Sequence, residues 1–179
     1  MGLLSPLLSG NESVTQAEID AKQPLAGDRI WCPASMFSMQ GGAPTLTGTG
    51  GTGSLQGWLL DAATVENVVS TLLVPPWWAT LAVDVWWLNA GAGAGAVRLR
   101  TVFASHAVGT TVSTTTSDVS ATYTAGAQNE IMKATSHVTS VAVDSAVPQR
   151  FGILRAGNDA ADTLANDILV IGLMLRRLT

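Results

Sequence analysis

Residues 80–103, TLAVDVWWLNAGAGAGAVRLRTVF, decide the fold class of this chain. From Thr80 to Leu88 the side chains alternate between two faces, as they do on a β-strand. One face would carry Leu81, Val83, Val85 and Trp87, and the other Ala82, Asp84, Trp86 and Leu88. After the glycine-rich segment NAGAGAG the alternation resumes from Val97 to Phe103. Two alternating runs on either side of such a segment predict a β-hairpin.

Strand-like runs continue on both sides of this hairpin. They lie at residues 65–73, 110–124, 130–143, 150–155 and 168–177. About seven to nine short strands are expected in total, and helical patterns are nearly absent after residue 25. This pattern predicts an all-β protein, a jelly-roll-like antiparallel β-sandwich, over residues 56–179.

Residues 1–55 are expected to form an N-terminal arm with a short helix and a glycine-rich linker. The sequence SVTQ at 13–16 is a capping-box pattern and predicts a helix over 13–22, which ends before Pro24. A helix of this length is not stable alone, so it must dock on another surface. In the linker, Gly48, Gly50 and Gly53 match GxGxxG. No strand pattern leads in and no helix pattern follows, so the match does not indicate a nucleotide loop.

Composition and charge argue against several classes of partner. Only 12% of the residues are charged, against a typical value of about 25%. Nine Lys and Arg residues are scattered along a chain of net charge −4, which argues against nucleic-acid binding. The uncharged stretch at 67–83 is interrupted by Pro75 and Pro76, so we expect no membrane span. Cys32, the single cysteine, is predicted to be a small buried apolar residue.

The residues that could carry out acid–base chemistry are few. The two histidines, His106 and His137, each follow a serine, but no GxSxG sequence is present. We therefore interpret both as surface histidines and predict that the chain is not an enzyme. One Cys and two His also cannot make a Cys/His zinc site. No cofactor or metal is expected.

An acidic loop near the C-terminus has three interpretations. It contains Asp159, Asp162 and Asp167 among asparagines. A pair of carboxylates for glycoside hydrolysis would need a cleft, which one loop rarely builds. A calcium loop is an alternative, although the spacing does not match an EF-hand. We favour a structural turn in which Asp and Asn side chains cap the backbone and Arg155 pairs with Asp159 or Asp162.

The adjacent residues Trp86 and Trp87 must point to opposite faces of their strand. One belongs in the core, and the other needs a second apolar surface, which a partner subunit would supply. A sugar-binding platform is the alternative. The predicted interface combines these tryptophans with apolar residues of the arm. The full set is Leu3, Leu4, Leu7, Leu8, Ile19, Trp86 and Trp87.

Residues 58–179 resemble a jelly-roll domain of bacteriophage fibres, spikes and capsid decoration proteins. The matching pieces are VPPWWATLAVDVWWLNAGAGAGAVRLRTVF at 74–103 and RFGILRAGNDAADTLANDILVIGLMLRRL at 150–178. The matching positions are Pro76, Trp77, Trp86, Trp87, Val97, Arg98, Arg155, Asp159, Asp162, Thr163 and Asp167.

The resemblance implies a homotrimer in a virion. The expected function is capsid decoration, in which the trimer sits on the major capsid protein or another virion protein and cements it or projects from it. The alternative is a head- or tail-fibre domain that binds a host glycan.

Overall fold

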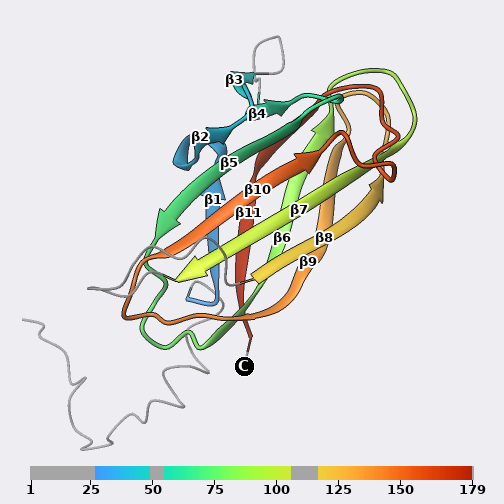
Figure 1. Ribbon diagram of the computed structural model, residues 1–179. Helices are drawn as coiled ribbons and strands as arrows, with labels where there is room; N and C mark the ends of the chain where they lie inside the picture. Colours follow the sequence, from blue (N-terminus) through green and yellow to red (C-terminus); the bar gives the residue numbers. More distant parts are fainter. Residues whose placement is uncertain (1–26, 49–54, 106–116, 179) are drawn as a thin grey trace, which may run out of the picture.

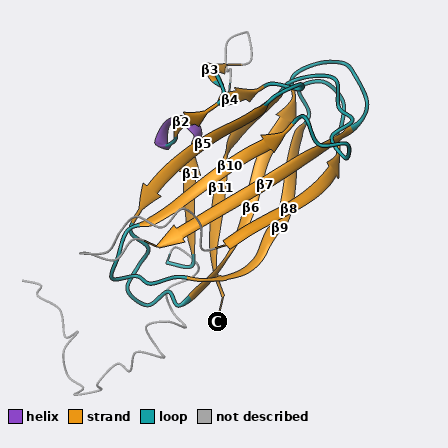
Figure 2. Cartoon of the chain, viewed as in Figure 1, coloured by secondary structure: helices purple, strands orange, loops and turns teal. Residues whose placement is uncertain are grey.

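The computed structural model describes residues 27–48, 55–105 and 117–178, which form a sandwich of two antiparallel β-sheets (Figures 1 and 2). The only helix in these ranges is one 3-10 turn, η1 (Ala34–Met36). The predicted all-β, jelly-roll-like sandwich is therefore confirmed. The helix predicted over 13–22 lies outside the described residues. No helix in the described part of the chain is long and apolar enough to cross a membrane.

The first sheet is built around β11, and we call it the β11 sheet. Its strands follow the order β3-β4-β11-β6-β9. β6 pairs along one side of β11. On the other side of β11, β4 pairs with residues 168–170 and β1 pairs with residues 172–176. The strands are β1 (Arg29–Pro33), β3 (Thr45–Gly48), β4 (Gln56–Leu60), β6 (Thr80–Asn89), β9 (Ile131–Ala142) and β11 (Ile168–Leu178).

The second sheet, the β10 sheet, lies in front of the first in Figure 1. Its order is β2-β5-β10-β7-β8, with every neighbouring pair antiparallel. The strands are β2 (Ser38–Gly41), β5 (Val65–Leu72), β7 (Ala96–Ser105), β8 (Ser117–Thr124) and β10 (Gln149–Ala156).

The predicted hairpin of residues 80–103 is wrong, because β6 and β7 belong to different sheets. β6 pairs with β11 and β9, whereas β7 pairs with β10 and β8. The glycine-rich segment between them therefore crosses from one sheet to the other. Each strand does turn an apolar face to the core, as the alternation predicts. The sequence alternation is the same whether two strands are neighbours in one sheet or lie in opposite sheets and face each other across the core.

The sandwich extends further toward the N-terminus than the predicted boundary at residue 56. β1 forms a ladder with β11 from the pair Arg29–Arg176 to the pair Pro33–Gly172. β2 pairs with β5, and β3 pairs with β4. Much of the described part of the predicted arm and linker thus consists of short strands that belong to the sandwich.

The core lies between the two sheets. β6 contributes the four side chains predicted for its apolar face, all fully buried: Leu81, Val83, Val85 and Trp87. From the β10 sheet, Phe103 and Phe151 meet edge to face at 4.8 Å between ring centroids. Cys32 of β1 is also buried, as predicted, and burial raises the pKa of its thiol to about 11.

Candidate functional site

Arg155 and Asp162 form a fully buried ion pair at the end of β10. Asp162 accepts hydrogen bonds from Nε and Nη2 of the guanidinium at 3.0 and 2.8 Å. The guanidinium also donates to three backbone carbonyls, those of Leu60, Leu164 and Asn166. Asp159 and Asp162 were the two expected partners of Arg155, and in the structure Arg155 pairs with Asp162. The pair ties the loop between β10 and β11 to the end of β4.

The other two carboxylates of this loop also bind backbone groups. Asp159 accepts a hydrogen bond from the Ala161 amide at 2.8 Å, and Asp167 accepts one from the Ala62 amide at 3.1 Å. These contacts are those of a structural turn. In the part of the chain that the structure describes, no group of three or more His, Cys, Asp or Glu side chains could hold a metal ion.

Ser136 and His137 lie on opposite sides of β9 and do not face each other. The Ser136 hydroxyl accepts a hydrogen bond from Arg176 at 2.7 Å on the outside of the sandwich. His137 is buried on the inside, where its Nδ1 lies 2.8 Å from the Tyr123 hydroxyl. Burial lowers the pKa of His137 from 6.5 to about 4, so the ring is neutral near pH 7. The prediction of a surface histidine is therefore wrong for His137, and His106 lies outside the described residues.

Trp86 and Trp87 point to opposite faces of β6, as predicted. Trp87 is fully buried in the core, whereas Trp86 lies half-buried on the outer face of the β11 sheet. There Trp31 of β1 packs edge-on against Trp86, with ring centroids 6.1 Å apart and planes at 85°. Part of the second apolar surface that Trp86 needs thus comes from the same chain. Trp31 remains 38% exposed.

Gly172 of β11 makes this arrangement of tryptophans possible. A Cβ atom at Gly172 would lie 2.9 Å from two ring atoms of Trp31 and would also meet the backbone oxygen of Cys32. The absent side chain lets the Trp31 ring lie directly over β11 and reach Trp86. The six-membered ring of Trp31 thus lies close to Gly172, while the residue stays partly exposed to solvent.

Asp84 is a completely buried carboxylate on the same outer face. It accepts hydrogen bonds from the Ser136 amide at 2.7 Å and from Arg176 at 3.1–3.2 Å, and Lys133 Nζ lies 2.8 Å away. Burial alone would raise the pKa of Asp84. The hydrogen bonds from Lys133, Ser136 and Arg176 outweigh burial and hold that pKa below its usual value.

A bulge in β9 delivers the Ser136 amide to Asp84. Between the pairs Val83–Val138 and Val85–Ala134, β9 has three residues where β6 has one, and Ser136 adopts a positive φ of 50°. Bulges of this kind re-aim backbone and side-chain groups at functional sites. Lys133 also lies over the ring of Trp86, 5.5 Å from its centroid. The cations and the tryptophans of this face are therefore in contact.

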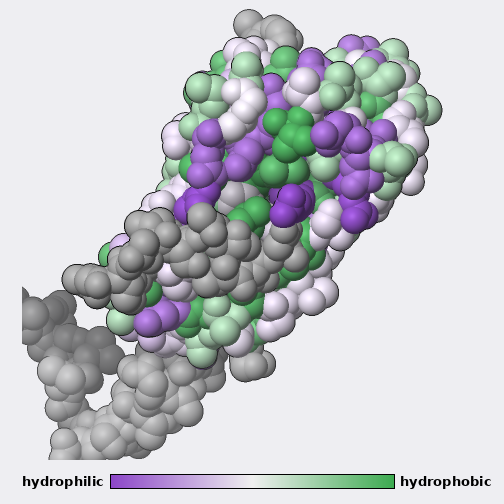
Figure 3. All heavy atoms as spheres, viewed as in Figure 1, coloured by the Kyte–Doolittle hydropathy of each residue, from purple (hydrophilic) through white to green (hydrophobic). Residues whose placement is uncertain are grey.

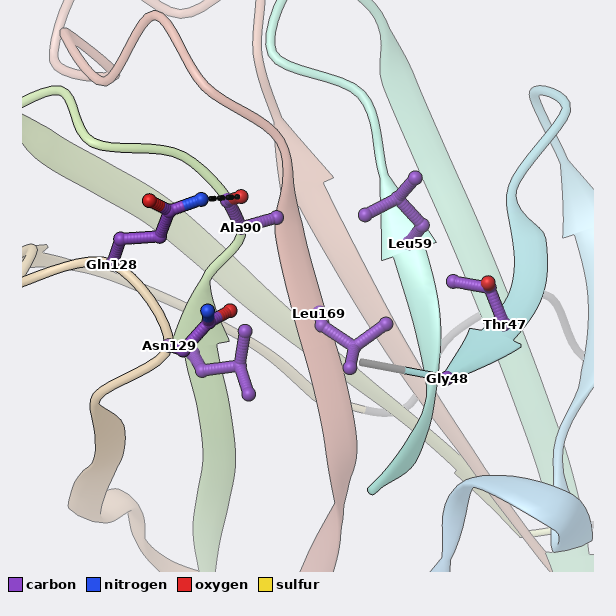
Figure 4. A pocket seen from close by; sticks show the side chains of 8 residues that line it. Thr47, Gly48, Leu59, Ala90, Gln128, Asn129 and Leu169 are labelled. Atoms are coloured by element: carbon purple, nitrogen blue, oxygen red, sulfur yellow. Dashed lines mark hydrogen bonds between the residues drawn. The ribbon is translucent and has the colours of Figure 1, made fainter. Parts of the chain in front are cut away.

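A hollow of about 290 Å³ opens on the outer face of the β11 sheet, toward the start of β11 (Figure 4). Its floor consists of three leucines side by side on β4, β11 and β6: Leu59, Leu169 and Leu88. Figure 4 shows Gln128 and Asn129 on one side of the floor and Thr47 on the other. None of the described residues that line this hollow is charged.

A second hollow, of about 500 Å³, lies beside the first and shares Leu59 with it. It is larger and is lined by Asp61, Glu66 and Asp167. Their oxygens are used by the backbone: Glu66 accepts from the amides of Ala43 and Asp61, and Asp61 accepts from Ala63 and Thr64. We therefore assign these carboxylates to the turn that joins β4 and β5.

The outer face of the β10 sheet, which Figure 3 shows in part, is more polar. Hydrophilic residues surround a small hydrophobic area there. Because Val97, Leu99 and Thr101 of β7 are buried in the core, the alternate residues Arg98 and Arg100 point outward on this face. No exposed tryptophan lies on its described strands.

The candidate site is therefore the outer face of the β11 sheet. It combines an apolar floor, side-chain amides and a hydroxyl at the rim, and the Trp31–Trp86 pair. Leu88 and Trp86 lie on the same face of β6, two residues and about 7 Å apart, so the hollow and the tryptophans adjoin.

Comparison with known proteins gives structural matches alone. No family model matches the chain, and no curated protein matches it. The CBM36-1 domain of a multidomain xylanase, from the hindgut metagenome of Trinervitermes trinervoides, matches with a TM-score of 0.53 and 8% identity over 85% of this chain and 99% of that one. A family 35 carbohydrate binding module from Clostridium thermocellum matches with a TM-score of 0.51 and 11% identity over 84% and 98% of the two chains. The likeness lies in the fold.

A match to a phage protein is weaker. The enzymatically active domain of tailspike protein 4 of bacteriophage CBA120 matches with a TM-score of 0.47 and 10% identity, over 83% of this chain and 19% of that chain. This value is too low to support an inference. The jelly-roll part of the sequence resemblance is thus supported, and the phage part is not.

Sequence reasoning missed the residues that complete this face. Trp31 lies in the segment assigned to the arm, and Gln128 and Asn129 lie in a turn between two predicted strands. One signal was available, because Arg29, Trp31 and Pro33 alternate with Ile30 and Cys32 as on a short strand. The predicted arm residues Leu3, Leu4, Leu7, Leu8 and Ile19 lie outside the described residues.

Proposed function

We propose that the chain is a non-catalytic glycan-binding β-sandwich and that the outer face of the β11 sheet binds the sugar. The observation that supports this most directly is the exposed Trp31 beside a hollow with a leucine floor and an amide rim. Ligand sites of this kind are concave and mostly apolar, with a few polar groups that fix orientation.

The chemistry of the face suits a sugar ring. A pyranose has an apolar side made of C–H groups, which an indole face can stack against. Its hydroxyls both donate and accept hydrogen bonds, and a side-chain amide can do the same. Gln128 uses its amide nitrogen to hold the Ala90 carbonyl at 3.2 Å. Its side-chain oxygen is not used in that hydrogen bond, and the Asn129 amide lies between Gln128 and Leu169 in the view of Figure 4.

The structural neighbours support the same proposal. One of them is a family 35 carbohydrate binding module, and another is the CBM36-1 domain of a xylanase. Both matches cover nearly the whole neighbour, so the shared part is an entire domain. These matches favour the glycan-binding alternative over capsid decoration.

A place in a virion and a homotrimeric state are parts of the proposal that come from the sequence resemblance. In that setting the domain would be a fibre or spike head that holds a host glycan. Decoration of the major capsid protein is the function predicted first from the sequence. No described feature of the structure favours it.

The proposal is tested by measuring glycan binding with matched tryptophan variants. We expect binding on a glycan array, followed by calorimetric titration of the best ligand. Trp31→Ala should weaken that binding about tenfold or more, which corresponds to the loss of about 1.4 kcal/mol. Trp77→Ala is the control, because Trp77 is 58% exposed but lies in the loop between β5 and β6.

A second variant tests the hollow itself. Asn129→Gly removes the amide and keeps the positive φ of 62° at this position, which glycine adopts freely. It should weaken binding while the melting temperature stays the same. An array without a single bound glycan, or equal losses in the Trp31 and Trp77 variants, would show that this face is not a sugar site.

A further inference from the structure

The charges on the outer face of the β11 sheet do not balance. Among the described residues, three cations lie there, Arg29, Lys133 and Arg176, against one carboxylate, Asp84. Asp84 is fully buried beneath Lys133 and Arg176, whose side chains stay 37% and 26% exposed. The face therefore presents two positive charges in excess. This is unusual for a chain whose net charge is −4.

Arg29 and Arg176 stand directly opposite each other on β1 and β11. Both are on the outer face, because the next pair on that face is Trp31 with Met174. Like charges at directly opposed positions destabilise a sheet. Arg29 is exposed, and among the described residues no carboxylate pairs with it. Asp84 already binds Arg176, so the Arg29 guanidinium is the one whose charge a ligand anion would balance.

We infer that this face binds an acidic glycan, with the ring of a carboxylate-bearing sugar on Trp31 and its carboxylate at Arg29 and Arg176. The inference rests on the proposed function and specifies its ligand class. Trp31 follows Arg29 by two residues on the same face, about 7 Å along the strand. A sugar on the indole can therefore reach the guanidinium with its carboxylate. Arginine donates paired hydrogen bonds that fit the two oxygens of a carboxylate.

The hollow fixes where the neutral part of the ligand lies. The described residues that line it are leucines, amides, a threonine and other uncharged residues. Along β6, the hollow lies on one side of Trp86 and Arg176 lies on the other. The ligand is therefore an oligosaccharide with an uncharged sugar over the hollow and an acidic sugar over Trp31. Uronates and sialates share the required chemistry.

A single-stranded nucleic acid is an alternative ligand, because it also combines rings that can stack on tryptophan with anionic groups. Its binding requires a groove of cations that follows the backbone over several nucleotides. Here the cations gather at one end of the face, and the hollow next to them is uncharged. The geometry favours one anionic group with neutral neighbours.

The test compares ligands that differ only in the carboxylate. Polygalacturonate fragments are titrated against their methyl esters, and sialyllactose against lactose. We expect the acidic member of one pair to bind about tenfold or more tightly, with an affinity that falls as NaCl rises. A preference within the polygalacturonate pair would identify a uronate ligand, and a preference within the sialyllactose pair would identify a sialate ligand.

Arg29→Gln is the informative variant, because Arg29 does not contact Asp84. It should remove most of the preference for the acidic member and leave binding of the neutral member unchanged. Arg150→Gln, on β10 of the other sheet, is the matched control and should keep the preference. Trp31→Ala should weaken both members of the pair.

The outcomes separate the two proposals. If Trp31→Ala weakens glycan binding but acidic and neutral members bind equally, the acidic inference is wrong and the glycan site stands. The same holds if Arg29→Gln and Arg150→Gln behave alike. If no member binds, both fail. Displacement of the glycan by a single-stranded oligonucleotide of equal charge at lower concentration would identify a nucleic-acid surface instead.

Discussion

Asp162 illustrates how much a single residue stabilises this sandwich. The sequence suggests a turn-capping side chain, whose loss costs about 0.5–2 kcal/mol. In the structure, the Asp162 side chain is fully buried and carries the only carboxylate bound to the buried guanidinium of Arg155 among the described residues. Removing one partner of a buried ion pair leaves an uncompensated charge and costs about 3–5 kcal/mol.

We therefore predict that Asp162→Ala lowers the free energy of unfolding by about 3 kcal/mol or more. Urea unfolding followed by tryptophan fluorescence would measure it. Asp159→Ala is the control, since the Asp159 side chain is 43% exposed and lies 3.9 Å from Arg98. That variant loses a turn cap and an exposed ion pair and should cost less than about 2 kcal/mol. Equal losses in the two variants would contradict the ion-pair account.

His137 should make stability depend on pH. Its pKa in the folded state is about 4, below the unfolded value near 6.5, because the ring is buried. The unfolded chain therefore binds more protons between these values, and stability is lost as pH falls from about 6.5 toward 4. Between pH 7 and pH 5 the loss attributable to His137 should be about 2 kcal/mol.

The comparison that isolates this residue is His137→Gln, which cannot take up a proton. Its unfolding free energy should change less than that of the natural chain between pH 7 and pH 5, whatever its stability at pH 7. Parallel pH profiles for the two proteins would mean that His137 is solvated in the folded state.

At the scale of strands, the sequence predicted most elements well. β5, β10 and β11 lie within one or two residues of their predicted ranges, because each is a run of alternating or continuous apolar residues with turn residues at its ends. Sheet membership was not predictable in the same way. β6 and β7 turn apolar faces toward each other across the core, and their sequences contain no sign of which sheet each joins.

The candidate site was predicted only in part. Trp86 was singled out because two adjacent tryptophans cannot share one core. Its contact Trp31 was missed, because β1 is five residues long and follows a segment that reads as an arm. The two side chains meet because β1 and β6 both pair with β11, and local sequence patterns do not contain such distant pairings.

Gly172→Ala should disrupt β1 as an element. The new methyl group would meet the ring of Trp31 at about 2.9 Å and the backbone of Cys32. We expect β1 to move away from β11 and the glycan affinity to fall together with the melting temperature. Gly152→Ala in β10 is the control, because its nearest contact is 3.3 Å, from a Val69 side chain. A Gly172 variant with unchanged binding would show that Trp31 does not need its position over β11.

For the whole molecule, the described sandwich begins with two residues that should be retained in any truncation. The Gly27 carbonyl accepts a hydrogen bond from Trp78 Nε1 at 2.9 Å, and Asp28 pairs with Arg177 at 3.3 Å. We predict that a chain lacking residues 1–26 folds with a melting temperature within a few degrees of the full chain. Circular dichroism during heating would measure this.

The same truncation tests the predicted homotrimer. Light scattering of the full chain should give the mass of three chains, and the truncated chain should keep that mass if the sandwich forms the interface. A trimer that becomes a monomer on truncation would assign the interface to residues 1–26. A monomeric full chain at micromolar concentration would remove the trimer from the proposal.

The central place of β11 in its sheet has a consequence for how the protein is made. β11 holds β1, β4 and β6 together, yet it occupies residues 168–178, near the C-terminal end of the described chain. During synthesis, about 140 residues must leave the ribosome after β1 before that strand can find its partner, and such distant pairings form slowly. Until then the apolar sides of β4 and β6 lack their neighbour. A nascent chain stalled before residue 168 should therefore bind chaperones, and its Trp31 side chain should not yet bind a sugar.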